Sequence, residues 1–188
     1  MTTAEPTVIV LAAGKGDRFR ASGGAAHKLD ALLDGKPVLR HVLDAVNASG
    51  LGHYLVRPEG GTAGMGDSIA LGVRATADAA GWLILPGDLP LITPDSLRRV
   101  ADALRHNALV VPHYQQQHGH PVGFGRQYLR ALLALNGDSG ARAIVRRARA
   151  DGTVRSLPLT DVGIIQDIDS LADLQQAQQR LDEVIKRA

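Results

Sequence analysis

The sequence contains no cysteine, and only 3% of its 188 residues are aromatic. The absence of cysteine excludes disulfide bonds, thiolate catalysis, cysteine-ligated zinc and iron–sulfur clusters. The few aromatic side chains leave little surface on which single-stranded bases could stack. Because the excess of basic over acidic residues is only +2, we also expect no polyanion-binding surface and no nucleic-acid partner.

Long apolar stretches are absent as well. No segment reaches the roughly 18 apolar residues that a membrane-spanning helix needs. The first residues have neither the basic nor the apolar part of a secretory signal, so we expect a cytoplasmic protein without membrane association. A chain of 188 residues that is 45% hydrophobic and 21% charged is typical of one globular domain, here covering residues 1–188.

Short apolar runs alternate with segments of helical period, which predicts an α/β sheet with crossover helices. Strands are expected at 8–11, 54–56, 82–85, 108–111, 154–157 and 163–165. Helices are expected at 37–48, 68–80, 126–135 and 139–150, and residues 114–119 are expected to form a polar loop. Two further helices have start signals: Thr93 followed by Pro94, and Ser170 with Asp173 in a capping box.

A glycine-rich turn, Leu11-Ala12-Ala13-Gly14-Lys15-Gly16, directly follows the first expected strand. Backbone N–H groups in such a turn can bind an anion, and ligands of open α/β sheets bind at this edge. Arg18 and Lys28 would add the positive charge that a triphosphate requires. The motif is neither a Rossmann fingerprint nor a P-loop. A tight turn without a ligand is the alternative interpretation.

Carboxylates follow two expected strands. Asp88 lies in Pro86-Gly87-Asp88-Leu89-Pro90, and Asp167 and Asp169 follow residues 163–165. If those two strands lie near each other, the carboxylates converge, and like charges at close range favour a divalent metal between them. The alternatives are that Asp88 only organises its turn and that Asp167 and Asp169 cap the last helix.

Three other motifs are assigned structural roles. The segment 137–140 copies the serine loop of chymotrypsin-like proteases, but helix-forming sequence surrounds it, so Ser139 is predicted to be a helix N-cap. His118 and His120 lack a third ligand for a metal. The arginines of segment 142–149 are predicted to form a solvated helix face, with a phosphate-bearing partner as the alternative; they are Arg142, Arg146, Arg147 and Arg149.

These motifs, in this order, resemble the molybdopterin nucleotidyltransferases, within the larger group of glycosyltransferase-A-like nucleotidyltransferases. The resemblance is strongest to the molybdenum cofactor cytidylyltransferase-like branch, which is related to the molybdopterin-guanine dinucleotide synthases. It covers about residues 7–181, and the matching segments are 11–19, Lys28, 35–39, 64–68, 87–90, 119–122, 137–142 and 167–169. Leu-Ala-Ala-Gly at 11–14 is typical of the members that use CTP.

The resemblance implies a mostly parallel, doubly wound sheet with helices on both faces. It also implies transfer of CMP from CTP to the terminal phosphate of the molybdenum cofactor, with release of pyrophosphate. Magnesium, or manganese, would be held by Asp88 with Asp167 or Asp169, and a molybdoenzyme maturation chaperone would be a possible partner. The residues implied to be catalytic are Arg18, Lys28 and Asp88. The residues implied to bind nucleotide are Leu11, Ala12, Ala13, Gly14, Gly16, Arg18, Lys28, Gly64, Met65, Gly66, Ser68 and Asp88. Those implied to bind the acceptor are His120, Pro121, Asp138 and Arg142.

Two alternatives stay open on the sequence alone. One is a nucleotidyltransferase that acts on a sugar phosphate or another small phosphorylated acceptor. The other is a catalytically silent protein that binds a nucleotide or cofactor during maturation of another enzyme.

Overall fold

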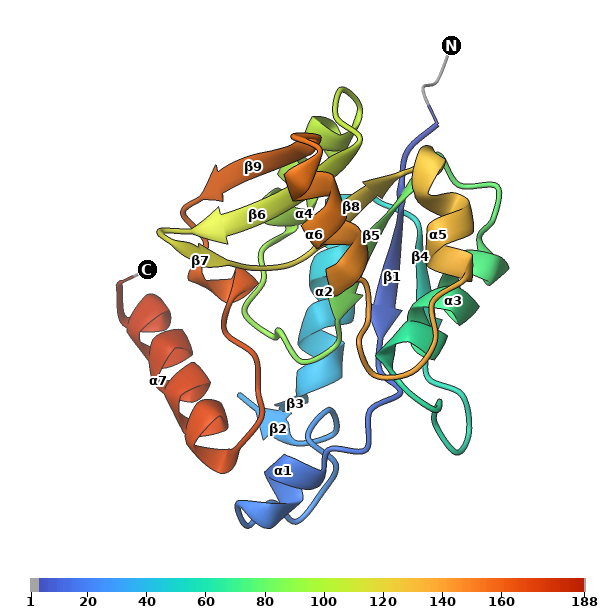
Figure 1. Cartoon of the computed structure of the whole chain (residues 1–188). Helices are drawn as coiled ribbons and strands as arrows, with labels where there is room; N and C mark the ends of the chain where they lie inside the picture. Colours follow the sequence, from blue (N-terminus) through green and yellow to red (C-terminus); the bar gives the residue numbers. More distant parts are fainter. Residues whose placement is uncertain (1–3, 188) are drawn as a thin grey trace.

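A central sheet of seven strands, in the order β4-β1-β5-β8-β6-β7 with β9 paired to β6, organises the computed structural model, which describes residues 4–187 (Figure 1). Its strands are β1 (Thr7–Leu11), β4 (His53–Val56), β5 (Gly81–Pro86), β6 (Leu109–Tyr114), β7 (Gln117–His118), β8 (Val122–Gly125) and β9 (Val154–Leu159). A separate small hairpin joins β2 (Leu32–Leu33) and β3 (Lys36–Pro37).

Most strands of the central sheet point the same way. Strands β4 and β5 are parallel to β1, and β9 is parallel to β6. Because β8 is antiparallel to both β5 and β6, those two strands share a direction. Only β7 and β8 run against the other strands of this sheet, so the prediction of a mostly parallel α/β sheet is confirmed. The carboxyl ends of β1 and β5 therefore meet at one edge.

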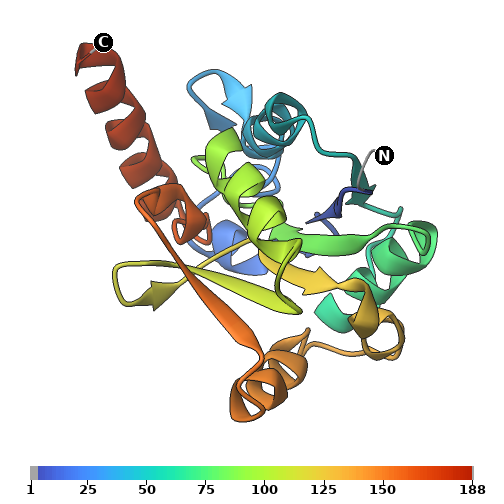
Figure 2. The same ribbon diagram turned by 90° about the horizontal axis from the view of Figure 1, so that it is seen from above.

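Helices cover both faces of the sheet (Figure 2). One face carries α2 (Val38–Ser49) and α4 (Pro94–Leu104), and the other carries α3 (Met65–Ala75), α5 (Leu129–Leu133) and α6 (Arg142–Ala150). In β1, Val8 and Val10 pack on the first face and Ile9 on the second, and all three are fully buried. Alternate strand residues point to opposite faces, which explains why a strand buried on both sides is apolar throughout.

Both predicted helix starts are confirmed. The Thr93 hydroxyl accepts a hydrogen bond of 3.2 Å from the Ser96 N–H at the start of α4. At the start of α7 (Leu171–Arg187), the Asp173 carboxylate accepts from the Ser170 N–H at 2.8 Å and the Ser170 hydroxyl accepts from the Asp173 N–H at 3.3 Å. Each cap satisfies backbone N–H groups that the helix leaves free.

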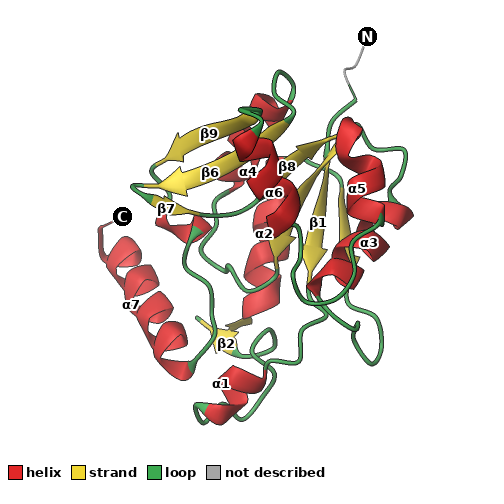
Figure 3. Cartoon of the chain, in the orientation of Figure 1, coloured by secondary structure: helices red, strands yellow, loops and turns green. Residues whose placement is uncertain are grey.

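Several predicted elements are wrong. Residues 163–165 form no strand; the segment is a short 3₁₀ turn, η2 (Val162–Ile164), between β9 and α7 (Figure 3). Ser139 is not an N-cap, because α6 begins three residues later and Ala141 precedes it. Two predicted helices form with different bounds. The helix predicted at 68–80 is α3, which begins and ends earlier, and the one predicted at 126–135 is divided into the turn η1 (Arg126–Tyr128) and α5. Strands β7 and β8 and helix α1 (Asp17–Ala21) were not predicted, and β7 lies inside the expected polar loop.

The membrane expectation has a structural counterpart. Within residues 4–187, no helix combines the length and the apolar character that crossing a bilayer would require.

Candidate active site

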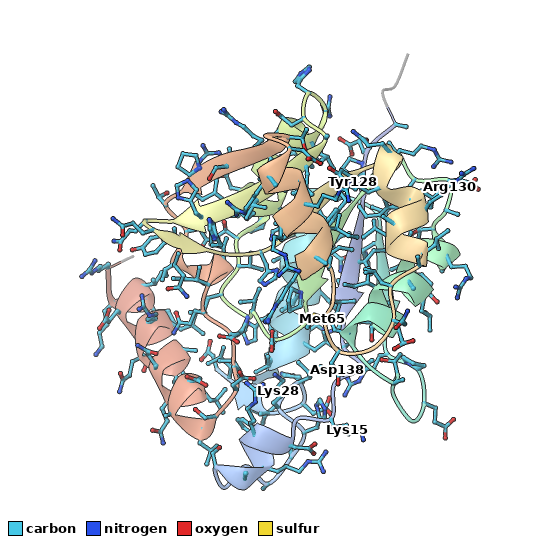
Figure 4. The ribbon with its side chains drawn as sticks, in the orientation of Figure 1. Lys15, Lys28, Met65, Tyr128, Arg130 and Asp138 are labelled. Atoms are coloured by element: carbon cyan, nitrogen blue, oxygen red, sulfur yellow. The ribbon has the colours of Figure 1, made fainter. Side chains whose placement is uncertain are left out.

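A cleft of about 620 Å³ opens at the edge where β1 and β5 end. Its walls are the turn after β1, the start of α3, the segment after β5 and parts of two later loops. Lys15, Lys28, Met65 and Asp138 lie together at this end of the molecule (Figure 4). Of the residues predicted to bind nucleotide, those lining the cleft are Leu11, Ala12, Ala13, Gly14, Gly16, Arg18, Lys28, Gly64, Met65, Ser68 and Asp88.

The turn after β1 presents free backbone donors. The Ala12 N–H still continues the sheet and donates to the Val56 carbonyl at 2.9 Å. Among the described contacts, the N–H groups of residues 13–16 have no hydrogen-bond acceptor. Gly16 has a φ of +69°, a conformation that favours glycine, and it leads into α1, whose Phe19 is buried in the core. The turn therefore has the form of an anion-binding nest.

His27 supports this turn, and the sequence analysis did not single it out. Its Nδ1 accepts a hydrogen bond from the Leu29 N–H at 3.2 Å, so the ring proton must be on Nε2, which donates to the Gly14 carbonyl at 2.7 Å. The imidazole thus joins the turn to the segment that carries Lys28. No sequence pattern announces such a contact, because it depends on how the loop between them folds back.

Lys28 lies between two of the predicted carboxylates. Its Nζ is 2.7 Å from Asp88 Oδ2 and 2.9 Å from Asp169 Oδ1. Arg18 Nη1 contacts the other oxygen of Asp169, also at 2.9 Å. The Lys28 and Asp88 side chains are only 15% and 14% exposed, whereas Arg18 is 83% exposed. The lysine pair is therefore partly removed from water, and the arginine pair is screened by it.

Burial and neighbouring charge act against each other in this group. Burial alone would lower the pKa of Lys28, but the charge and hydrogen bond of Asp88, with those of Asp169, outweigh it and raise that pKa. Burial raises the pKa of Asp167, and the charges of Asp88 and Asp169 raise it further. Burial also opposes ionisation of Asp169, yet Lys28 and Arg18 bring its pKa below the ordinary value. The carboxylates therefore need cations to stay ionised together.

Asp88, Asp167 and Asp169 could hold a metal ion, because each offers an oxygen within 4.8 Å of the others. Asp88 Oδ1 is buried and has no hydrogen-bond partner, which is unusual for a carboxylate oxygen in a protein. Oxygen ligands of this kind suit Mg²⁺ or Mn²⁺. The segment 163–169 is no strand, but it does lie beside the end of β5, where the Ile168 N–H donates to the Asp88 carbonyl at 2.9 Å.

The start of α3 packs against the loop that carries Asp138. The Gly66 N–H donates to the Gly137 carbonyl at 2.7 Å, and the Gly137 N–H donates to the Asp67 carboxylate at 2.9 Å. Gly66 therefore faces the loop and is not part of the cleft lining, whereas Asp138 is. Asp67, which the sequence analysis did not single out, positions Asp138 through this loop.

The other predicted acceptor residues lie outside the cleft lining. The His120 N–H donates to the Ile164 carbonyl at 2.9 Å, and burial lowers the pKa of its imidazole, although the charge of Asp88 acts in the opposite direction. Pro121 is buried, and Arg142 is exposed at the first residue of α6.

The arginines of α6 lie on different sides of the helix. Residues three and four apart share a helix face, so Arg142, Arg146 and Arg149 lie together, and all three are exposed. Arg149 contacts the His118 ring at 3.2 Å, and Arg147 lies within 3.9 Å of Asp151. No His joins the metal-ligand group found among residues 4–187.

A family model described as the MobA-like NTP transferase domain matches residues 8–153. The chain belongs to this family. Two curated relatives, each named bifunctional protein GlmU, are from Halorhodospira halophila (30% identical over 180 residues) and Xanthomonas campestris pv. campestris strain B100 (29% over 179). Both matches cover 84% of this chain but only 35% and 37% of the relatives. The chain thus spans about a third of the length of these relatives.

Solved structures share the fold of this MobA-like NTP transferase domain. Rv0371c from Mycobacterium tuberculosis superposes with a TM-score of 0.76 at 26% identity, covering 95% of this chain and 100% of its own. Its manganese complex gives 0.71 at 21% identity, with coverage of 93% and 98%. A CMP:2-keto-3-deoxy-manno-octonic acid synthetase complexed with CTP gives 0.67 at 14% identity, with coverage of 96% and 99%.

In this MobA-like NTP transferase domain, the lining of the cleft combines donors for anions with the carboxylates of Asp88 and Asp169. The free N–H groups of residues 13–16 and the cations Arg18 and Lys28 suit phosphate oxygens. The carboxylate group beyond Lys28 suits a divalent ion. This is the arrangement that nucleotidyl transfer requires, since that reaction depends on positioning and on neutralising charge.

Proposed function

We propose that the protein transfers CMP from CTP to the terminal phosphate of a molybdopterin-type acceptor and releases pyrophosphate. The observation that carries this proposal is that one cleft is lined both by unpaired backbone N–H groups at residues 13–16 and by the carboxylates of Asp88 and Asp169, next to which Asp167 lies. The choice of CTP and of a molybdopterin-type acceptor rests on the resemblance carried by the sequence motifs at 11–14, 64–68 and 137–142.

The residues have distinct parts in the proposed reaction. The N–H groups of Ala13, Gly14 and Gly16 bind triphosphate oxygens, and Arg18 and Lys28 offset the charge that builds on the leaving pyrophosphate. Asp88 with Asp167 or Asp169 would hold Mg²⁺, which supplies charge neutralisation at the α-phosphate when bound.

The bonding changes of the proposed reaction balance without a protein base. An oxygen of the acceptor phosphate forms a bond to the α-phosphorus as the bond from that phosphorus to the bridging oxygen breaks. The electron pair leaves with pyrophosphate. Since the second pKa of a phosphate monoester is ~6, the attacking oxygen is already ionised at neutral pH.

The acceptor side of the proposal rests on the motifs that the resemblance supplies. Asp138 lines the cleft. His120 lies near enough to Asp88 for the charge of that carboxylate to act on the pKa of the imidazole. Arg142 begins the helix that follows the Asp138 loop. We propose that these side chains, with Pro121, bound the space that the acceptor occupies.

A sugar phosphate is the second candidate acceptor. The observation that favours it is the shared fold with a 4-diphosphocytidyl-2C-methyl-D-erythritol synthase from Anaerococcus prevotii (TM-score 0.72 at 15% identity, covering 95% of this chain and 99% of its own), whose named product carries a cytidyl group through two phosphates on a sugar alcohol. Mass spectrometry separates the two candidates, because the product carries CMP on either molybdopterin or the sugar phosphate supplied.

The base preference gives the sharpest test. Ala13 lines the cleft, and its methyl group narrows the space that a purine needs, so CTP is expected to be used ~10–200-fold better than GTP. Ala13→Gly should reduce this preference without reversing it, since one methyl group is not the only determinant. The measurement is steady-state competition between CTP and GTP on molybdopterin and on glucose 1-phosphate.

The outcomes of this competition are distinct. Equal use of the two nucleotides, or preference for GTP, rejects the cytidylyl assignment but keeps nucleotidyl transfer. Nucleotide binding without pyrophosphate release on either acceptor favours the catalytically silent binding protein.

A further inference from the structure

Lys28 is paired with two carboxylates of the candidate metal group. The three carboxylates of the candidate metal group have two oxygens each. Lys28 Nζ holds Asp88 Oδ2 at 2.7 Å and Asp169 Oδ1 at 2.9 Å, and Arg18 holds Asp169 Oδ2 at 2.9 Å. Half of the carboxylate oxygens are therefore already paired with protein cations.

We propose that Lys28 is a resident counter-ion of the metal site, which keeps metal affinity low until a nucleotide draws the ammonium away. The identity of the site as a metal site rests on the proposed function. In the free protein, the Lys28 ammonium neutralises Asp88 and Asp169. When a triphosphate binds in the cleft, Lys28 turns to its oxygens, and a divalent cation can then bind the released carboxylates.

The two occupants exclude each other on electrostatic grounds. Lys28 and Asp88 are 15% and 14% exposed, so water screens their charges little. Without Lys28, three carboxylates whose oxygens lie within 4.8 Å would repel one another. With Lys28 in place, a divalent ion would meet an ammonium in contact with two of its ligands. The carboxylate group is therefore stable with either the Lys28 ammonium or the divalent ion beside it, and unfavourable with both.

The side chain of Lys28 can turn while its backbone stays in place. A Cβ added to Gly16 would lie 3.5 Å from the Lys28 backbone nitrogen, so this backbone lies against the turn after β1. The His27 ring holds it there through its two hydrogen bonds to Gly14 and Leu29. From this fixed point a flexible four-carbon chain carries the charge. Lys28 lines the same cleft as the free N–H groups. Its ammonium can therefore pair either with the carboxylates or with an anion bound at those N–H groups.

The consequence is coupling between nucleotide and metal. If nucleotide raises metal affinity by releasing the carboxylates, metal raises nucleotide affinity by the same factor. The free protein is then expected to bind Mg²⁺ or Mn²⁺ weakly, although its carboxylates already converge.

The test measures binding of Mn²⁺ alone, without nucleotide, by the electron paramagnetic resonance signal of free Mn²⁺. Lys28→Met removes the ammonium and keeps an unbranched side chain, and it is expected to tighten Mn²⁺ binding by about tenfold, within the usual range of coupled sites. Lys15→Met is the matched control, because Lys15 lines the same cleft but its side chain makes no ion pair among the described residues. It should bind Mn²⁺ as the wild type does.

Two further variants make the outcomes separable. Lys28→Gln keeps a hydrogen-bond donor but lacks the charge, so it should also tighten Mn²⁺ binding. It replaces Lys28→Met in the test if that variant folds poorly. Mn²⁺ should raise the Tm of either Lys28 variant more than that of the wild type. Asp88→Asn combined with Lys28→Gln reports whether the carboxylates bind the ion at all.

If neither Lys28 variant binds Mn²⁺ more tightly, and the added Asp88→Asn change weakens binding, the counter-ion role of Lys28 is overturned while the metal site stands. If Asp88→Asn leaves Mn²⁺ binding unchanged, the metal assignment of the proposed function fails, and the role of Lys28 fails with it.

Discussion

Asp88 makes two contacts with different segments of the chain and keeps one oxygen without a partner. Its Oδ2 accepts from Lys28, its backbone carbonyl accepts from the Ile168 N–H, and its Oδ1 stays buried without a partner. The first contact joins Asp88 to the segment that follows α1, and the second joins it to the segment that carries Asp167 and Asp169. A change of charge at this one residue therefore affects both the ion pair with Lys28 and the candidate metal group.

Asp88→Asn is expected to abolish turnover and leave the fold intact, because the amide matches the carboxylate in volume but lacks its charge. The measurement is pyrophosphate release at saturating Mg²⁺, with the exposed Asp78→Asn as control. Retention of more than about a tenth of wild-type turnover would mean that less than ~1.4 kcal/mol of the barrier depends on this charge. The metal assignment would then be wrong.

The convergence of Asp88, Asp167 and Asp169 was predicted at the residue scale, and their oxygens do lie within 4.8 Å of one another. The predicted cause, a strand at 163–165, is wrong, because that segment turns as η2. The contacts of Lys28 with Asp88 and Asp169 could not be predicted. The sequence places this charge near the turn after β1 but does not show which side chains it contacts. His27 escaped prediction for a similar reason. A neutral imidazole that bonds two backbone groups has no sequence pattern of its own.

At the scale of elements, the start of α3 and the loop 136–138 behave as one unit. A Cβ added to Gly66 would lie 2.6 Å from the Asn136 carbonyl oxygen. The close approach allows the hydrogen bond from the Gly66 N–H to Gly137 and brings Asp138 to the cleft. Glycine is required at this position by contact between two backbones, not by its own φ.

Gly66→Ala should lower the free energy of unfolding by ~1–3 kcal/mol, because the added methyl group has to push the loop away. The sign is informative, since alanine at an unhindered helix position would add up to ~1 kcal/mol of stability. Urea unfolding measures the change. Gly52→Ala is the control, because a Cβ there meets no atom within 4 Å, and it should stay within ~0.5 kcal/mol of the wild type. Unchanged or increased stability of Gly66→Ala would contradict the close contact.

Elements with strong local signals were predictable, and elements that depend on close packing were not. The Thr93 cap and the Ser170–Asp173 box are local, and both form as predicted. Strand β8, Val-Gly-Phe-Gly, lacks an apolar run. It forms because Gly123 and Gly125 fit where a Cβ would lie 3.2 Å from Val100 and 3.0 Å from the Ala108 carbonyl. Residues 163–165 carry an apolar pattern but turn, because Gly163 packs directly on the backbone of Leu91.

At the scale of the whole molecule, two cores share one sheet. Trp82 and Phe124 fill one face, while Leu83, Leu85 and Val110 fill the other. Since β5 and its neighbours contribute to both cores, loss of either core exposes the sheet that supports the other. We therefore expect the whole chain to unfold as one unit, so its stability can be followed as a single quantity.

That stability should fall on mild acidification. Burial lowers the pKa of His120, and burial together with the charges of Arg149 and His113 lowers that of His118. Below the ordinary value of 6.5, the unfolded chain binds protons that the native histidines resist, so the free energy of unfolding decreases as the pH falls through this value. Urea unfolding between pH 8 and pH 5.5 measures the slope, which His120→Gln should flatten.

A direct check of the same sign is the NMR titration of the His120 ring, assigned by comparison with His120→Gln. Its midpoint should lie below 6.5. A midpoint at or above that value would show that the native state takes up the proton as readily as the unfolded chain, and the predicted loss of stability would not have this origin.

The carboxylate group has a consequence for the order in which the protein is made. Asp169 follows Lys28 by 141 residues and Arg18 by 151. At ~5–20 residues per second, a ribosome needs about 7–28 s to travel from Lys28 to Asp169. Asp88 follows Lys28 by only 60 residues, so for the rest of that interval the nascent chain holds Asp88 but not Asp169, the second carboxylate that contacts Lys28. The carboxylate group is complete only once Asp169 has been added, so a chain that is cut short before this residue lacks one of the three carboxylates of the candidate metal site.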